Sequence, residues 1–241
     1  MLRVHSIETF GTHEGPGIRL VVFLQGCNFR CLYCHNPDTH DINGGYNLAF
    51  KKIVEMAKEQ EHYFHEKGGI TVSGGEPLLQ SEKLTQFFKA LKKRNIHTAL
   101  DTNGSILNEE VKKLLQYTDL VILDIKHINP DSHKEITGTD NKEVFKFAKY
   151  LKKINKNFWL RLVLVPELTS KEMHLQSVGE YFKDYSNLER VEILPYHSLG
   201  VYKYKAMEKK YELENVPMTD EKTKKKAKQI LQRYFKDVHV R

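Results

Sequence analysis

The stretch "IRLVVFLQGCNFRCLYCHNP", residues 18–37, joins an apolar run to a loop that holds every cysteine of the 241-residue chain. The run Ile18–Leu24 has the length and composition of a strand buried on both faces. Cys27, Cys31 and Cys34 follow it with the spacing C-x3-C-x2-C. An odd number of thiols crowded into one loop does not fit a disulfide framework, and it indicates a metal or cluster site.

Short apolar runs followed by polar loops recur along the whole chain. Runs such as "LVIL" and "LRLVLV" are typical of buried parallel strands, and amphipathic patterns of helical period lie between them. We expect strands at Ile18–Leu24, Ile70–Ser73, His97–Leu100, Leu120–Asp124, Phe158–Val165 and Val191–Leu194. We expect helices at Leu48–Glu66, Ser81–Arg94, Asn108–Tyr117, Lys142–Asn155, Ser170–Tyr185 and Thr219–Phe235.

Six strand–helix units predict an α/β fold with right-handed crossovers. Because a complete barrel has eight units, a partial (β/α)6 TIM-like barrel and an open doubly wound sheet both fit this pattern. We expect a single domain over residues 1–241. It would carry a short N-terminal extension at 1–17 and a basic C-terminal helix at 219–235.

Unusual polar residues stand where the expected strands end. "SGGEP" (73–77), "DTNG" (101–104), "DIK" (124–126) and "LPYH" (194–197) each follow or close a strand, and Arg161 lies within one. Parallel strands in such folds bring their carboxyl ends to one face, where the functional sites lie. We therefore expect these residues and the cysteine loop to share that face.

The composition is that of a globular protein, with 40% hydrophobic and 29% charged residues. No apolar run reaches the roughly 20 residues of a membrane span, and no signal peptide is recognisable, so we expect a cytoplasmic protein without membrane contact. The net charge is +7, and the tail "KTKKKAKQILQRYFKDVHVR" (222–241) is markedly basic. This tail is either a solvated helix face or a weak docking surface for an acidic protein, such as a small electron carrier, or for nucleic acid. No motif for binding nucleic acid is present.

The local chemistry of the cysteines leaves two metal sites open. Thiolates suit iron–sulfur clusters, and three of them would leave one iron of a [4Fe–4S] cluster without a protein ligand. A tetrahedral zinc site would need a fourth ligand, which His35 or His40 could supply.

The full pattern, C-x3-C-x-aromatic-C with Tyr33 before Cys34, resembles the signature of radical S-adenosylmethionine (SAM) enzymes. The resemblance implies a partial (β/α)6 barrel. It also implies that Cys27, Cys31 and Cys34 hold a [4Fe–4S] cluster, and that the amino and carboxylate groups of SAM coordinate the fourth iron.

The motifs "GPGIR", "QGCNFRCLYCHNPDT", "SGGEP", "LDTNG", "LDIK", "LVLVPE" and "LPYHSLG" follow the order seen in pyruvate formate-lyase activating enzymes, which activate a glycyl-radical enzyme. This resemblance implies reductive cleavage of SAM with flavodoxin or ferredoxin as the reductant. The resulting radical would take a hydrogen atom from a backbone glycine of pyruvate formate-lyase. The chain has no further cysteine for an auxiliary cluster.

The same resemblance implies the residues of the cofactor site. Gly74, Gly75 and Glu76 would meet the SAM amino group, and Asp101 and Asp124 would hold a monovalent cation. The segment "GTHEGPG" (11–17) would belong to the rim that contacts the peptide substrate. The expected SAM contacts are Tyr33, Cys34, His35, Asn36, Gly74, Gly75, Glu76, Asp124, Ile125, Lys126, Arg161 and His197.

Structural roles are open for several of these residues. Asp101 could form a turn, Asp124 and Lys126 an ion pair at a strand end, Arg161 a structural ion pair, and His197 could be an interior histidine. For the whole chain, two other functions compete. One is a radical SAM enzyme that acts on a different substrate, and the other is a zinc-stabilised binding protein that uses its basic tail.

Overall fold

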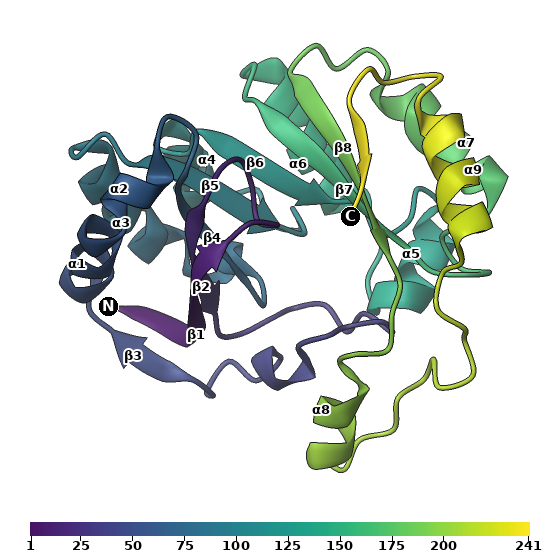
Figure 1. Ribbon diagram of the computed structural model, residues 1–241, viewed down its shortest axis with the longest axis horizontal. Coiled ribbons are helices and arrows are strands. Elements are labelled where there is room, and N and C mark those ends of the chain that lie inside the picture. The colour runs from purple at the N-terminus through teal and green to yellow at the C-terminus, as the bar shows by residue number, and fades with distance from the viewer. The chain divides into compact units, whose positions relative to one another are not determined.

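The computed structural model describes all residues, 1–241, and they group into two compact units (Figure 1). The first unit consists of residues 1–28 and 38–122, and the second of residues 29–37 and 123–241. The chain therefore crosses from the first unit to the second and back within the cysteine loop.

The first unit is a sheet with helices packed against it. Its strand order is β3-β1-β2-β4-β5-β6, in which β1 is antiparallel to β2 and β3, while β2, β4 and β5 are parallel. The strands are β1 (Leu2–Gly11), β2 (Arg19–Leu24), β3 (Tyr46–Leu48), β4 (Gly69–Gly74), β5 (His97–Thr102) and β6 (Leu120–Asp124), whose last two residues belong to the second unit. The helical segments are η1 (Pro37–Thr39, which begins in the second unit), α1 (Phe50–Glu59), α2 (Glu61–Phe64), η2 (Pro77–Gln80), α3 (Ser81–Lys92) and α4 (Glu109–Gln116).

Burial of apolar residues explains why these segments fold as they do. Leu20, Val22, Ile70 and Val72 on the parallel strands are fully buried, as expected for strands covered on both faces. Helix α3 buries Leu84, Phe87, Phe88 and Leu91, which lie on one face at helical spacing.

The second unit contains three parallel strands, β7 (Phe158–Leu164), β8 (Leu188–Pro195) and β9 (Val238–Val240). Its helices are α5 (Pro130–Thr137), α6 (Lys142–Lys153), α7 (Glu172–Phe182), α8 (Val201–Ala206) and α9 (Glu221–Leu231). Helices α7 and α9 pack against each other. The ring of Tyr234, which follows α9, lies so close to α7 that a Cβ at Gly179 would be 2.2 Å from it. In Figure 1 the last strand, β9, lies beside β8.

The α/β class with parallel strands is confirmed, and all six expected strands are present. Three further strands, β1, β3 and β9, were not expected, and neither were helices α5 and α8. Residues 1–17 are more than an extension, because β1 occupies Leu2–Gly11 and pairs with both β2 and β3. The expected helix Leu48–Glu66 is divided into α1 and α2 at Gln60. No helix of the chain is long and apolar enough to cross a bilayer.

Two histidines of the second unit are buried against each other. The rings of His127 and His174 stack with their centroids 4.1 Å apart and an interplanar angle of 16°. The backbone N–H of Asn129 donates to Nδ1 of His127 (3.0 Å), and that of Ile128 donates to Nδ1 of His174 (3.4 Å). Both acceptor nitrogens must be unprotonated, and burial lowers the pKa of His174 to about 3.

Acid is therefore expected to destabilise the chain through His174. A histidine of the unfolded chain titrates near pH 6.5. Below pH 6.5 the unfolded chain binds a proton at this residue that the folded state does not bind. The stability that is present above pH 6.5 is therefore lost as the pH falls towards 3. At about pH 5 this loss is about 2 kcal/mol.

Urea unfolding at about pH 7.5 and about pH 5 should show a smaller loss for His174→Gln than for the wild type. His62→Gln, at an exposed position on α2, should keep the wild-type loss. An equal loss in His174→Gln would contradict this assignment.

Candidate active site

Backbone hydrogen bonds hold the cysteine loop in both units. In the first unit, Gly26 precedes Cys27 with a positive φ of 97°, and its N–H donates to Thr39 O at 2.9 Å. In the second unit, the N–H groups of Arg30 and Leu32 donate to the carbonyls of Thr137 (2.8 Å) and Ile136 (2.9 Å) at the end of α5. The N–H of Cys34 donates to Cys31 O at 3.0 Å and closes a tight turn. All three cysteines are half-buried, and none forms a disulfide.

The two glycines of "SGGEP" let the end of β4 approach the start of this loop. A Cβ at Gly75 would lie 2.1 Å from Gly26 O and 3.2 Å from the Cβ of Cys27. Gly74 has a positive φ of 107°, a conformation that favours glycine. The N–H of Glu76 then donates to Gly26 O at 2.8 Å. No larger residue fits at position 75 without displacing the backbone beside Cys27.

The side chain of Glu76 is fully buried. Its Oε1 accepts hydrogen bonds from the Leu78 N–H (2.9 Å) and the Thr102 hydroxyl (2.6 Å), and its Oε2 accepts one from the Asn103 N–H (2.8 Å). Burial raises the pKa of Glu76 to about 7, although these donors act in the opposite direction. The carboxylate thus joins the loop after β4 to the loop after β5.

The two expected cation ligands are placed at strand ends. Asp101, in β5, accepts a hydrogen bond from the Ser73 hydroxyl at 2.8 Å. Asp124, the last residue of β6, forms an ion pair with Lys126, with Oδ2 and Nζ 2.9 Å apart. The other oxygen of Asp124, Oδ1, is buried and has no hydrogen-bond partner. An acceptor of this kind fits a bound cation or a donor group of a ligand.

Lys126 also lies close to the aromatic residue of the cysteine motif. Its Nζ is 5.8 Å from the centroid of the Tyr33 ring, a cation–π distance. The hydroxyl of Tyr33 is buried without a hydrogen-bond partner. Ile125, next to Lys126, is buried and donates its N–H to Arg161 O at 3.0 Å. The second unit therefore brings together the expected residues Tyr33, Asp124 and Lys126.

His35 and His197, both expected at the site, are stacked on each other. Their ring centroids are 4.2 Å apart, and Nε2 of His35 is 2.9 Å from the carbonyl oxygen of His197. Burial lowers the pKa of both imidazoles.

Helix α8, which the sequence analysis missed, packs on the segment that follows Cys31. The Tyr204 hydroxyl donates to Cys34 O at 3.1 Å, and Lys203 Nζ donates to Asn36 Oδ1 at 2.8 Å. A Cβ at Gly200 would lie 2.8 Å from the Cα of His35. Residues 200–204 therefore fix the position of the last cysteine and the two residues after it.

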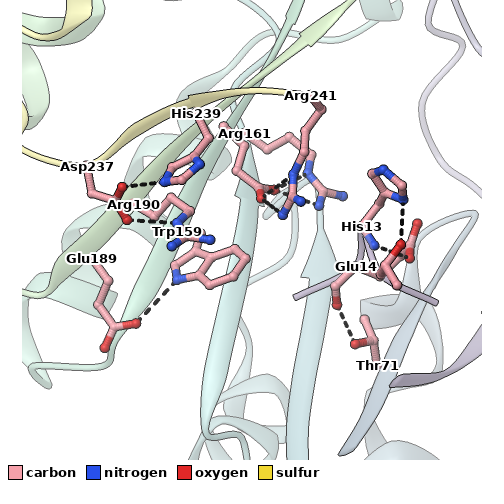
Figure 2. A network of polar contacts seen from close by, with 12 residues as sticks. His13, Glu14, Thr71, Trp159, Arg161, Glu189, Arg190, Asp237, His239 and Arg241 are labelled. Carbon is pink, nitrogen blue, oxygen red and sulfur yellow. Dashed lines mark hydrogen bonds and ion pairs between the residues drawn. The ribbon is translucent and has the colours of Figure 1, made fainter. Parts of the chain in front are cut away.

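Arg161 forms a buried ion pair with Glu192, which also pairs with the more exposed Arg241. Figure 2 shows Arg161 and Arg241 in close-up. Arg161 and Glu192 are opposite each other on β7 and β8, and Arg161 Nη2 lies 2.8 Å from Glu192 Oε2. Arg241 Nε donates to Glu192 Oε1 at 3.0 Å. Glu192 is fully buried. The structural ion pair considered for Arg161 is thus present. Sequence reasoning missed Glu192, although a lone charge within the run "VEIL" was a signal.

The donor set fits the cluster that the sequence analysis expected. Three thiols stand within eight residues of one loop, and the sequence contains no fourth cysteine. Thiolate sulfur is the usual protein ligand of iron–sulfur clusters. The buried unpartnered oxygen of Asp124 and the ammonium of Lys126 offer complementary charges to a ligand that carries both an amino and a carboxylate group.

Comparisons with known proteins agree with this donor set. The sequence profile of the Radical SAM superfamily matches residues 21–175. The chain is 41% identical over 235 residues to the pyruvate formate-lyase 1-activating enzyme of Escherichia coli K12, covering 96% of both chains. It is 43% identical over 232 residues to the pyruvate formate-lyase-activating enzyme of Staphylococcus epidermidis, covering 93% of this chain and 92% of that one.

Solved structures show the same fold. A domain of pyruvate-formate lyase-activating enzyme from Bacteroides vulgatus aligns with a TM-score of 0.61 at 22% identity, over 72% of this chain and 99% of that one. Streptococcus suis SuiB bound to S-adenosylmethionine aligns with a TM-score of 0.66 at 14% identity, over 89% of this chain and 48% of that one. At such identities the likeness establishes the fold alone.

Proposed function

The chain belongs to the radical SAM superfamily and, within it, to the pyruvate formate-lyase activating enzymes, and we propose that it generates the glycyl radical of a pyruvate formate-lyase. The observation that carries this proposal is the 41% identity over 96% of both chains, together with the three half-buried cysteines of one loop. The enzyme is an oxidoreductase whose cofactors are one [4Fe–4S] cluster and SAM.

The residues of the loop would divide the work of holding these cofactors. Cys27, Cys31 and Cys34 would each bind one iron as thiolates and leave one iron for SAM. When bound, the reduced cluster would supply one electron to the sulfonium of SAM, and cleavage of a C–S bond would then give methionine and a 5′-deoxyadenosyl radical. The buried surroundings of Tyr33 would keep water away from the reacting centre.

We also propose the SAM contacts expected above: Tyr33, Cys34, His35, Asn36, Gly74, Gly75, Asp124, Ile125, Lys126, Arg161 and His197. Lys126 would offset the negative charge of Asp124, to which it is paired at 2.9 Å. The unpartnered Oδ1 of Asp124 supports a monovalent cation at this residue. The resemblance to the family implies Asp101 as a further ligand of that cation.

The glycine substrate would enter as an extended peptide that reaches the rim segment 11–17. This segment is anchored in the first unit, where the Thr71 hydroxyl donates to Glu14 O (Figure 2) and the Arg19 guanidinium donates to Pro16 O at 2.9 Å. The segment precedes β2, whereas Cys27 follows it. Six strand residues span roughly 20 Å, so a peptide that touches both ends must be extended over about that length.

Flavodoxin or ferredoxin would supply the electron, and we infer a cytoplasmic location because reduced thiols persist there. The basic helix α9 gives limited support to a docking role. Two of its lysines are already paired within the chain, Lys224 with Glu221 at 2.7 Å and Lys226 with Glu172 at 2.9 Å. These pairs favour the solvated-face interpretation of the tail.

Electron paramagnetic resonance (EPR) tests the proposed activity. An anaerobic mixture of reconstituted protein, reductant, SAM and pyruvate formate-lyase from the same source should give a doublet signal, because the unpaired electron couples to the glycine α-hydrogen. Deuterium at that position should collapse the doublet. A mixture that accumulates 5′-deoxyadenosine without a protein radical would instead support a radical SAM enzyme with another substrate. Stoichiometric zinc without iron or sulfide would support the zinc-stabilised binding protein.

A further inference from the structure

The three loops that follow β2, β4 and β5 are joined by one hydrogen-bond network in the first unit. Glu76 holds the Asn103 backbone through Oε2. The side-chain amide of Asn103 donates to Asn28 Oδ1 at 3.2 Å and accepts from the Ser105 N–H at 2.9 Å. The amide of Asn28 donates to the Ser105 hydroxyl at 2.8 Å.

This network holds the residues immediately before and after Cys27. On the N-terminal side, the Glu76 N–H donates to Gly26 O. On the C-terminal side, Asn28 is held by Asn103 and Ser105. The carboxylate of Glu76 ties the two sides together, because it fixes the loop that carries Asn103 and Ser105.

The carboxylate of Glu76 makes its hydrogen bonds inside the first unit and is not exposed to solvent. None of the side chain is exposed, and three donors surround the two oxygens. The Thr102 hydroxyl accepts from the Gly104 N–H at 3.0 Å, so its own hydrogen is available for Glu76. The three donors occupy three of the roughly four acceptor positions of a carboxylate. Because the side chain is fully buried, an ammonium group could reach the remaining position only after the surrounding residues moved.

We propose that Glu76 is a positioning residue that fixes Cys27, the first cluster ligand, and that it does not contact the SAM amino group. The proposal rests on the proposed function, since it takes Cys27 as a cluster ligand. It assigns the effect of a Glu76 substitution to the cluster itself, even when SAM is absent.

The rate at which an iron chelator removes the cluster from the reconstituted holoenzyme tests the proposal. Absorbance measures this rate in the absence of SAM. Glu76→Gln replaces one acceptor oxygen by a donor amide, which must then face one of the three donors. Residues that orient metal ligands typically change metal affinity 10- to 100-fold, so we expect cluster loss to be about 10-fold faster. The EPR spectrum of the reduced cluster without SAM should change as well. Glu109→Gln, an exposed carboxylate on α4, should behave as the wild type.

Asn28→Ala provides a second variant that leaves Glu76 and its three donors in place. Asn28 is exposed, so the substitution carries little risk for folding. We expect faster cluster loss here too, and less than additive effects when it is combined with Glu76→Gln, because both act through one network. Asn43→Ala, at another exposed asparagine of the first unit, is the matched control.

Two outcomes would overturn the proposal. Glu76→Gln could weaken SAM binding while cluster loss and the EPR spectrum without SAM stay as in the wild type, which would restore the ammonium contact. Asn28→Ala could lose the cluster at the wild-type rate, which would break the link to Cys27. Failure of the proposed function is distinguishable, because a wild-type protein without iron would reveal it before any variant is made.

Discussion

Alanine at Cys27, Cys31 or Cys34, introduced singly, is expected to abolish both cluster assembly and SAM cleavage. Each thiolate would hold one iron, and the chain has no other cysteine to replace it. Iron and sulfide analysis after anaerobic reconstitution, together with the yield of 5′-deoxyadenosine, measures the effect. The fold should survive, because backbone groups such as the N–H of Arg30 and of Leu32 hold the loop. Far-ultraviolet circular dichroism checks this point.

A variant that keeps full SAM cleavage would remove its cysteine from the ligand set. His35→Ala distinguishes an iron–sulfur cluster from the alternative of a zinc site. In a zinc site with three cysteines and His35, this variant would lose metal as the cysteine variants do. With a cluster held by three thiolates, it should retain iron and sulfide.

Glu192→Leu is expected to produce the largest loss of stability, about 3–5 kcal/mol. The substitution leaves Arg161, which is 6% exposed, and the guanidinium of Arg241 without their shared carboxylate. Removing one partner of a buried ion pair costs far more than the pair itself contributes. Urea unfolding measures the change. Exchanging Arg161→Met together with Glu192→Leu should recover part of the loss, because an apolar pair then replaces the broken one.

Glu189→Leu is the matched control, since Glu189 lies on the same strand, β8, and is exposed. Figure 2 shows its contact with Trp159, whose indole Nε1–H donates to Glu189 Oε2 at 3.3 Å. Exposed polar contacts are worth about 1 kcal/mol or less, so this variant should stay within that range. If Glu192→Leu cost no more than Glu189→Leu, the buried cluster would not contribute to stability as its geometry indicates.

The sequence by itself determined the elements whose signals are local. The six strands β2, β4, β5, β6, β7 and β8 were predictable from short apolar segments, most clearly β2 and β6, because a strand buried on both faces is a continuous apolar run. The start of α4 was predictable because Asn108 caps it and accepts a hydrogen bond from the Val111 N–H. The position of the motifs after these strands was also predictable, because a residue that follows a parallel strand lies at its carboxyl end. Even α5 had a local signal, Asn129 followed by Pro130, but the helix is only eight residues long.

The tertiary structure alone decided which groups those residues meet. Glu192 faces Arg161, 31 positions away, because of the register between β7 and β8. His35 lies on His197 across 162 positions, and α8 covers the cysteine segment from a similar separation. Glu76 illustrates the difference most clearly. Its place after β4 follows from the local pattern, but its carboxylate turns towards Thr102 and Asn103 and away from solvent. A partner distant in the chain depends on packing and register, which no local pattern of residues encodes.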